Sequence, residues 1–288
     1  LLGTLLTRSP RSLLIGDHRQ LPAVVQQSDY DTHVGDETLQ AAGVKNLGTS
    51  LFERLYLTAR ANDWSWAYDQ LRHQGRMHRE VMAFPALHFY QGELDILPSA
   101  IDHHRQQIAE LSLVAGNNQL EQRISANRLV FIDAEVDRAS SDPKVNRHEA
   151  DLMVSLVKAF TSVYARTDRP VLSGDIGIIT PYRAQIALIR SRLAEAALLP
   201  DDYTVDTVER YQGSAKRIVL MSLCTNDPQQ LDRMAQISEE GVDRKLNVAM
   251  TRAREHLVLV GCPDILQGND VYAKLLDHVR TTPVDSCN

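Results

Sequence analysis

The sequence predicts an α/β fold built on a doubly wound parallel sheet, and two patterns predict it. Short apolar runs recur along the chain, each ending in turn or polar residues, as in the strands of a parallel sheet covered on both faces. Segments with helical spacing alternate with them, which is typical of doubly wound folds. The expected strands are residues 13–15, 129–132, 176–179, 218–221 and 257–260.

Two helices can be placed between these strands. Residues 147–164 carry apolar side chains at helical spacing, with Glu149 and Asp151 near the start, where acidic residues favour a helix. Residues 181–197 carry a second apolar stripe, and Pro181 suits a first helical turn.

Two stretches interrupt the alternation. Residues 26–48 are polar and contain glycines, which predicts a loop or linker. Residues 98–127 are rich in Gln, His and Asn, which predicts an exposed insertion that carries a helix. The sequence contains no internal repeats.

Composition sets the broad class. The 288 residues are 43% hydrophobic and 24% charged, as in soluble globular proteins of one large or two ordinary domains. No apolar run approaches the roughly 20 residues that span a bilayer, and no signal peptide opens the chain. Cys224, Cys262 and Cys287 have neither metal-ligand nor disulfide spacing. We therefore expect a cytoplasmic protein with reduced thiols, no membrane segment and no metal site.

The net charge bears on possible partners. A formal charge of −6 argues mildly against nucleic-acid binding, since such proteins usually carry a basic surface. Any nucleic-acid contact must then come from a local groove. Composition alone fits a small-molecule enzyme just as well.

Five short runs are more informative: residues 16–22, 74–78, 179–185, 205–213 and 244–254. The first run, GDHRQLP, follows an expected strand, and α/β sheets bind ligands in loops at the carboxyl ends of strands. There Gln20 can orient a water or sense a terminal phosphate, and Asp17 can couple to metal-bound water or a partner strand. Taken alone, an ordinary polar turn is the better interpretation of this run.

In this order and spacing the five runs resemble motifs III to VI of superfamily 1 helicases, in the branch of the nonsense-decay RNA helicase and the replication helicase-nuclease. That branch has GDxxQLPP, QYRMH, VDTVxxFQG and RRLNVAxTRA, where this chain has GDHRQLP, QGRMH, VDTVERYQG and RKLNVAMTRA. The resemblance covers nearly the whole chain apart from the insertion. It implies a RecA-like fold, with residues 1–69 as the tail of a first RecA-like domain and residues 70–288 as the second.

Two family motifs are absent from the chain. It has no GxxxxGK[ST] phosphate loop, and Asp36-Glu37 lies in a polar loop instead of ending an apolar strand. Both motifs precede motif III in the family, so we expect a missing N-terminal RecA-like domain that holds the Mg²⁺ ligands. The chain alone should then be inactive, although the whole motor would use ATP and Mg²⁺.

The resemblance assigns residues to the nucleotide. It implies that Arg76 and Arg252 are arginine fingers on the γ-phosphate, a role that suits the permanently charged, planar guanidinium. It implies that Gln20 senses the γ-phosphate or places the attacking water, and that Asp17 helps to couple the domains. Residues 212–213, Gln212 and Gly213, would let the backbone approach the nucleotide. Arg244 and Arg254 are interpreted as solvated charges.

The resemblance also assigns residues to single-stranded nucleic acid, with DNA favoured over RNA. Thr207 can donate its hydroxyl to a phosphate, and Thr180 with the helix start at Pro181 can bind another. For Tyr182, a structural role and a nucleic-acid contact have equal weight. Such contacts do not depend on sequence, as a translocating motor requires.

Two positions depart from the family pattern. Gly75 stands where the family has the Tyr of QYRMH, and Ala215 stands where motif V has a Glu. The resemblance implies that this Tyr stacks on the base and this Glu touches the ribose. We therefore expect weak discrimination between nucleotides.

The sequence thus predicts part of an ATP-dependent helicase that moves 5′ to 3′ on single strands. One alternative is a non-catalytic nucleic-acid-binding module that kept the fold and lost hydrolysis. A phosphate loop upstream in the reading frame would separate the two. A nuclease or unrelated NTPase lacks the necessary carboxylate or histidine cluster.

Overall fold

The computed structural model describes residues 11–22, 32–114, 116–211, 213–238 and 240–281. The chain divides into two compact units, Leu1–Leu71 and Arg72–Asn288. We call these unit 1 and unit 2 and describe each by itself.

Unit 1 contains the helices α3 (Glu37–Ala41) and α4 (Leu51–Ala61). Both begin at side-chain caps: Asp36 accepts a hydrogen bond from Leu39 N–H, and Ser50 accepts one from Glu53 N–H. The loop predicted over residues 26–48 therefore contains a short helix, because an Asp cap followed by Glu favours one helical turn. Residues 23–31 lie outside the described residues.

The strand predicted at residues 13–15 is wrong. These residues form no strand, and Leu13 and Ile15 are each 85% exposed. A strand needs a neighbour to satisfy its N–H and C=O groups, and the described residues of unit 1 form no sheet. Among the described residues of unit 1, the apolar run therefore has no strand to pair with.

Unit 2 is built on a parallel sheet, so the predicted fold class is confirmed. Within the described residues the strand order is β3-β7-β6-β4-β5, and every neighbouring pair is parallel. Each of the four other predicted runs lies within one strand of this sheet. The short β5 was not predicted, because Val205 is its single apolar residue. The strands are β3 (Leu129–Asp133), β4 (Ile176–Ile179), β5 (Thr204–Asp206), β6 (Lys216–Ser222) and β7 (Ala253–Gly261).

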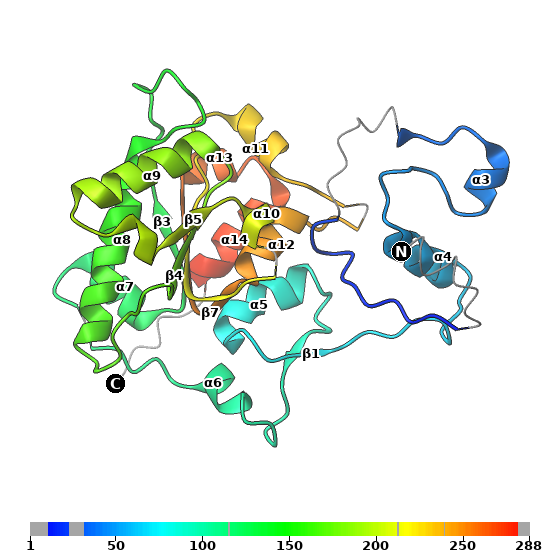
Figure 1. The fold of residues 1–288 in the computed structure, drawn as a ribbon, viewed down its shortest axis with the longest axis horizontal. Helices are drawn as coiled ribbons and strands as arrows, with labels where there is room; N and C mark the ends of the chain where they lie inside the picture. Colours follow the sequence, from blue (N-terminus) through cyan, green and yellow to red (C-terminus); the bar gives the residue numbers. More distant parts are fainter. Residues whose placement is uncertain (1–10, 23–31, 115, 212, 239, 282–288) are drawn as a thin grey trace. The chain divides into compact units, whose positions relative to one another are not determined.

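Helices cover both faces of this sheet (Figure 1). On one face lie α7 (Gln119–Ala126), α8 (Arg147–Ala165) and α9 (Arg183–Glu195), and on the other lie α5 (Arg79–His88), α12 (Arg244–Met250) and α14 (Asp270–Thr281). Phe160 and Met153 on α8 are fully buried against Ile178 and Leu220 of the sheet. Each such side chain stabilises the fold by roughly 1.5–3 kcal/mol. The remaining short helices are α10 (Val208–Tyr211), α11 (Pro228–Met234) and α13 (Pro263–Leu266). Among the described residues, no helix has the length and apolar character to cross a membrane.

The structure confirms the predicted start of one helix and corrects the predicted start of the other. The first is confirmed as α8, which begins after its cap Asn146. The second begins at Arg183, so the placement of Pro181 in the first turn is wrong. Thr180 N–H still donates to the carbonyl of Asp206 on β5, at 3.2 Å. The chain therefore stays extended through Tyr182 before it can turn into α9.

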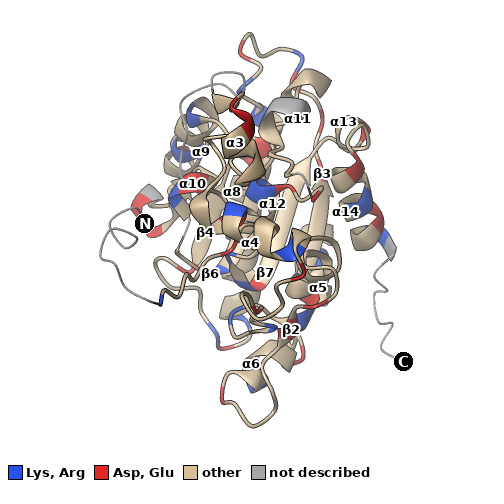
Figure 2. Cartoon of the chain, turned by 90° about the vertical axis from the view of Figure 1, so that its right-hand side faces the viewer, with Lys and Arg blue, Asp and Glu red and all other residues tan. Residues whose placement is uncertain are grey.

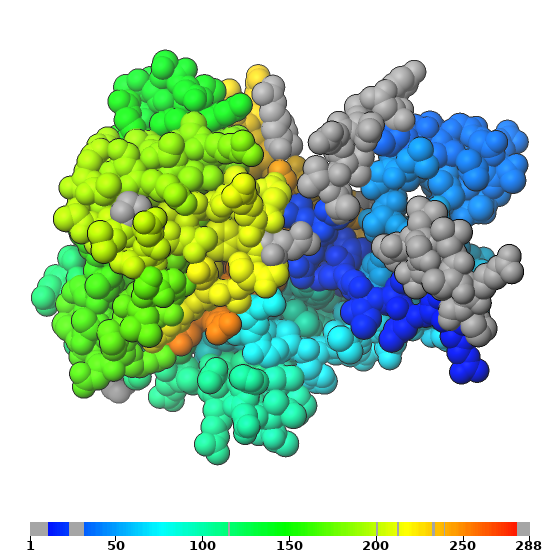
Figure 3. All heavy atoms as spheres, in the orientation of Figure 1, coloured from blue at the N-terminus to red at the C-terminus, as the bar shows by residue number. Residues whose placement is uncertain are grey.

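The segment predicted as an exposed insertion is partly buried. It does carry helices, α6 (His104–Ile108) and α7, and the α6 part projects from unit 2 (Figure 3). However, Ile124 is fully buried and Gln107 is 1% exposed. Ile124 packs into the core beside α8, which the polar composition of the segment conceals.

Two buried histidines make stability sensitive to acid. Burial, reinforced by Arg128, lowers the pKa of His256 to about 3 and that of His78 to about 4. Because the unfolded chain takes up these protons near pH 6.5, stability should fall as the pH drops below 6.5 towards 4. Each histidine should cost about 1.4 kcal/mol per pH unit in that window.

Urea unfolding of the 288-residue chain at pH 7 and pH 5 measures this effect. His256→Gln should weaken the pH dependence without abolishing it, because His78 still contributes, whereas His148→Gln on the exposed side of α8 should leave it as it was. Equal free energies of unfolding at the two pH values would contradict the assignment.

Candidate functional site

The run 74–78 forms a closed turn at the start of α5. Gln74, which ends the short strand β1 (His73–Gln74), accepts hydrogen bonds at Oε1 from the N–H groups of Arg76 and Met77, both at 2.8 Å. His78 N–H donates to the carbonyl of Arg254 at 2.8 Å. The turn is thereby attached to the amino end of β7.

The two predicted arginine fingers meet at Thr251. Arg76 Nη1 donates to the Thr251 carbonyl at 3.1 Å, and Arg252 Nη2 donates to its hydroxyl at 3.2 Å. Arg252 is 2% exposed, and its guanidinium also donates to the carbonyls of Val248 and Ser214. Arg76 is exposed. Two residues far apart in sequence are therefore brought to one place in unit 2.

The end of the run 205–213 lies at the same edge of the sheet. Ser214 accepts from Arg252, and Lys216 N–H donates to the Arg252 carbonyl at 2.9 Å. Gly213 has a φ of +85°, a conformation that glycine adopts without strain. Gln212 lies outside the described residues. This edge, at the amino ends of β6 and β7, is called the arginine edge below.

Arg254 was interpreted from sequence as a solvated charge, but it lies close to Arg76. Burial first, and then the nearby charge of Arg254, lowers the pKa of Arg76. Arg254 is exposed and makes no ion pair within the described residues. Two like charges side by side are suited to bind an anion such as phosphate. The signal in the sequence was a second Arg two positions after Arg252.

Asp17 and Gln20 lie in unit 1, whereas the arginines described above belong to unit 2. Gln20 Nε2 donates to Asp17 Oδ2 at 2.7 Å, and Asp17 Oδ1 accepts from Arg19 N–H at 3.0 Å. The ring of His18 lies 4.5 Å from that of Tyr56 on α4. The loop is therefore an ordered turn seated on α4.

The residues predicted to bind nucleic acid lie at the opposite edge of the sheet, where β4 and β5 end. Thr180 and Thr207 are joined through Asp206, which accepts from both backbone N–H groups. The Thr180 hydroxyl is buried and has no hydrogen-bond partner in the described part of the chain. It is closed to a ligand in this conformation. Thr207 is half-buried at the start of α10.

A groove of about 320 Å³ opens at this second edge, which we call the groove edge. Tyr182 precedes α9 and lines the groove, and two cationic side chains, Lys144 and Lys245, line it as well. Lys245 pairs with Glu209 at 3.4 Å. Lys144 was missed from sequence, because its loop belongs to none of the five runs. The lining residues are Pro143, Lys144, Pro181, Tyr182, Asp227, Gln229, Gln230, Met234 and Lys245.

A buried polar network supports this groove. Gln185 accepts from Asn146 N–H and donates to the Asn146 carbonyl, each at 2.9 Å, and also donates to Ser222. Asn226 donates to the carbonyl of Val145 at 2.7 Å. The network ties the loops after β3 and β6 to the starts of α8 and α9. Of its members, Gln185 ends the run 179–185, whereas Asn146, Ser222 and Asn226 belong to none of the five runs.

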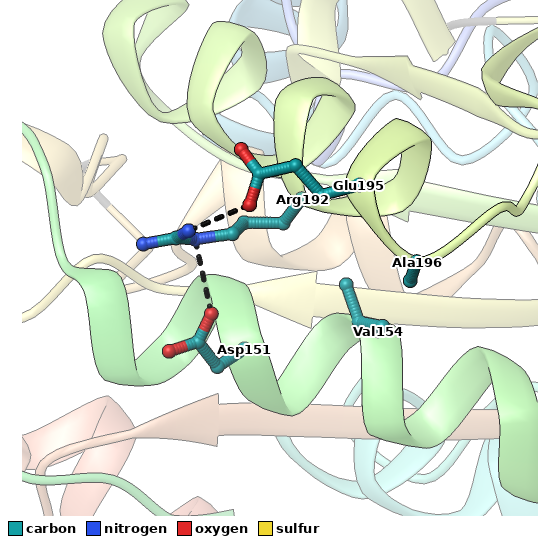
Figure 4. A pocket seen from close by; sticks show the side chains of 5 residues that line it. All are labelled: Asp151, Val154, Arg192, Glu195 and Ala196. Atoms are coloured by element: carbon teal, nitrogen blue, oxygen red, sulfur yellow. Dashed lines mark hydrogen bonds and ion pairs between the residues drawn. The ribbon is translucent and has the colours of Figure 1, made fainter.

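A second pocket, of about 300 Å³, lies between α8 and α9. Figure 4 shows Arg192 between Asp151 and Glu195, with ion-pair distances of 3.1 and 2.8 Å. The single cation of this pocket is already paired with both carboxylates, so the pocket is a poor candidate for an anion site.

The described residues contain no cluster of three or more His, Cys, Asp or Glu side chains that could bind a metal ion. Acidic and basic residues are interspersed over the elements (Figure 2). Within the described residues there is therefore no carboxylate cluster that fits a Mg²⁺ ion.

A family described as AAA domain matches residues 47–264. The chain belongs to the superfamily 1 helicases. The matched residues include four of the five runs, the arginine edge and the groove edge. The membership of the superfamily 1 helicases that the motifs predict is therefore confirmed.

Relatives of this helicase chain are longer proteins. The DNA-binding protein SMUBP-2 of Mesocricetus auratus is 27% identical over 94% of this chain and 24% of its own length. The DNA replication ATP-dependent helicase/nuclease DNA2 of Homo sapiens is 30% identical over 95% of this chain and 24% of its own. The 3'-5' exoribonuclease HELZ2 of Mus musculus is 29% identical over 92% of this chain and 8% of its own. The chain thus spans about a quarter of the first two.

A solved structure is also similar to this chain. It is the C-terminal domain of a possible DNA helicase from Lactobacillus plantarum, which is 12% identical with a TM-score of 0.32. The alignment covers 53% of this chain and 90% of that one.

Proposed function

We propose that this chain is the second half of an ATP-dependent motor that translocates on single-stranded nucleic acid and unwinds duplexes. One observation supports the proposal above all. The arginine edge and the groove edge lie at opposite ends of the same parallel sheet, since β6 and β7 begin at the first and β4 and β5 end at the second. A rigid sheet can therefore transmit a change at a nucleotide to a bound strand.

At the arginine edge, Arg76, Arg252 and Arg254 would bind the phosphates of ATP. Guanidinium groups there would stabilise the negative charge that develops as the γ-phosphoryl group is transferred to water. The ligands of a Mg²⁺ ion would have to come from residues outside those described here. Gln20 would place the attacking water and Asp17 would couple the domains, as the resemblance implies.

At the groove edge, Thr207 would donate to a phosphate, and Lys144 would add positive charge, whereas Lys245 is already paired with Glu209. Tyr182 would stack on a base. These contacts do not depend on the base sequence of the strand. The names of SMUBP-2 and DNA2 favour DNA over RNA as the strand. Cys224 and Cys262 are free and buried, which supports a reducing, cytoplasmic location.

The proposal predicts that the 288-residue chain alone does not hydrolyse ATP. It lacks the phosphate loop, so no residue cradles the β-phosphate. The protein encoded by the whole reading frame should hydrolyse ATP, and single-stranded DNA should stimulate it. Phosphate release from each protein, with and without a DNA oligonucleotide, tests both statements.

Stimulated hydrolysis by the 288-residue chain would contradict the proposed division of the motor. Strand binding without hydrolysis by the whole protein would favour the non-catalytic module instead.

Thr207→Ala in the whole protein should weaken strand binding before it affects basal hydrolysis. The lost bond runs from a hydroxyl to a charged phosphate, which corresponds to roughly a tenfold rise in Kd. Fluorescence anisotropy with a labelled oligonucleotide measures it. Thr161→Ala on α8 is the matched control, and a Kd for Thr207→Ala equal to that of the control would remove Thr207 from the interface.

A further inference from the structure

The loop that joins β3 to α8 carries Lys144, which lines the groove at the groove edge. An ion pair closes the neck of this loop. The guanidinium of Arg147 donates to both carboxylate oxygens of Asp137, at 2.7 and 2.6 Å, and Arg147 N–H donates to the same carboxylate at 3.0 Å. These hydrogen bonds hold the pKa of Asp137 well below its ordinary value, so the neck stays closed near neutral pH.

The side chain of Asn226, in the loop after β6, forms four hydrogen bonds to the Lys144 loop. Its Oδ1 accepts from Asp137 N–H at 3.0 Å and from Asn146 Nδ2 at 2.9 Å. Its Nδ2 donates to the carbonyls of Pro143 at 3.1 Å and Val145 at 2.7 Å. A side-chain amide has two donor hydrogens and an oxygen with two lone pairs, so its whole hydrogen-bonding capacity is used on this loop.

These bonds hold the backbone on both sides of Lys144. The two carbonyls that accept from Asn226 belong to the residues directly before and after it. Gln230 Nε2 adds a second bond to the Pro143 carbonyl at 2.7 Å, and Lys144 N–H donates to Asp142 Oδ1 at 2.9 Å. The direction in which the Lys144 side chain leaves the loop therefore depends on Asn226.

The charge of Lys144 is available to a ligand. Lys144 forms no ion pair with any described residue, whereas Lys245, which also lines the groove, is paired with Glu209 at 3.4 Å. The carboxylate of Asp227 lines the groove too, and its Oδ1 caps α11 by accepting from Gln229 N–H at 2.9 Å. A phosphate in the groove is therefore attracted by Lys144 and repelled by Asp227, so the position of this one ammonium group decides how well the phosphate binds.

We infer that Asn226 is a positioning residue for strand binding, which holds the loop so that the Lys144 ammonium group meets a backbone phosphate of the strand. The inference rests on the proposed function, in which single-stranded nucleic acid binds at the groove edge. Without the Asn226 side chain, the Asp137 N–H and the Val145 carbonyl would lose their partner. The loop would then open locally and carry Lys144 away from the phosphate.

The salt dependence of strand binding by the whole protein tests this inference. Each phosphate contact to a single strand contributes about 0.7 to the slope of log Kd against log salt concentration, or about fivefold in Kd at about 0.1 M salt. Lys144→Ala should lower the slope by about 0.7, and Asn226→Ala should lower it by about as much. The double variant should bind no more weakly than Lys144→Ala, because both changes remove the same contact. Fluorescence anisotropy with a labelled DNA oligonucleotide at several salt concentrations measures Kd and the slope.

Two matched variants control for changes elsewhere. Lys158→Ala removes an exposed lysine of α8, and Asn118→Ala removes the asparagine that caps α7 by accepting from Glu121 N–H. Both should keep the wild-type slope, although Asn118→Ala should lower the melting temperature. Asn226→Ser keeps a hydroxyl that can donate to one loop carbonyl, so its slope should lie between those of Asn226→Ala and the wild type. This milder variant provides the test if Asn226→Ala does not fold.

The outcomes separate this inference from the proposed function. A whole wild-type protein that binds no strand would overturn both. If it binds a strand and Lys144→Ala keeps the wild-type slope, the phosphate contact of Lys144 is absent and only this inference is overturned. If Lys144→Ala lowers the slope while the folded Asn226 variants lower only the melting temperature, Asn226 supports the fold and does not position Lys144.

Discussion

Arg76→Ala in the whole protein should lower strand-stimulated ATP hydrolysis by about 10³- to 10⁵-fold, the range measured for arginine fingers. Arg76 as a whole is an exposed residue at the arginine edge, and its partly buried guanidinium makes one described hydrogen bond, to the Thr251 carbonyl. Little of the fold depends on it, so the loss should appear in catalysis and leave Kd for the strand nearly unchanged. Phosphate release and oligonucleotide anisotropy measure the two quantities.

Arg252→Ala should lower ATP hydrolysis by a similar factor, but this variant needs a further control for loss of stability. Arg252 is buried and donates to Val248, Ser214 and Thr251, so its removal also loosens the junction of α12 and β7. Its melting temperature must therefore be measured beside its rate. Arg105→Ala on α6 is the matched exposed variant and should keep the wild-type rate. If Arg76→Ala also keeps that rate, Arg76 is an ordinary surface charge.

Glu149→Ala should lower the free energy of unfolding of the 288-residue chain by about 3–5 kcal/mol. Glu149 is fully buried in α8, and its carboxylate accepts four hydrogen bonds. They come from the Ser222 hydroxyl, the Cys224 and Thr225 N–H groups, and the Thr225 hydroxyl, at 2.7, 2.7, 2.9 and 3.2 Å. Burial raises the pKa of Glu149, while these donors act to lower it. Alanine would leave buried donors without an acceptor.

Urea unfolding followed by circular dichroism measures this change. Glu149→Gln keeps the shape but places an amide NH₂ group against the donors, so it should also destabilise the chain. Glu195→Ala is the control, because this exposed carboxylate pairs only with neighbours on α9 and should change stability by less than about 0.5–1 kcal/mol. A loss for Glu149→Ala no larger than the control's would mean that the loop after β6 finds other acceptors.

Much of unit 2 could be predicted from the sequence, because its apolar patterns are local. The strands β3, β4, β6 and β7 each contain a run of mostly apolar residues, and α8 carries apolar residues at helical spacing. Burial of those residues is required whatever the partner, so the pattern alone indicates the element. The run at 13–15 has the same pattern but forms no strand, since strand formation needs a neighbouring strand and the described residues of unit 1 form none.

For the candidate site residues too, the sequence determined one part and the tertiary structure another. The sequence by itself determined which residue types stand in the five runs, and so the family, the arginines and the missing aromatic ring at Gly75. Only the tertiary structure decided that Arg76 and Arg252 meet at Thr251, that Leu97 fills the space beside Gly75, and that the Thr180 hydroxyl is buried. These contacts join segments that pack together only after the sheet has formed. Spacing along the chain does not encode such distances, because packing between distant segments sets them.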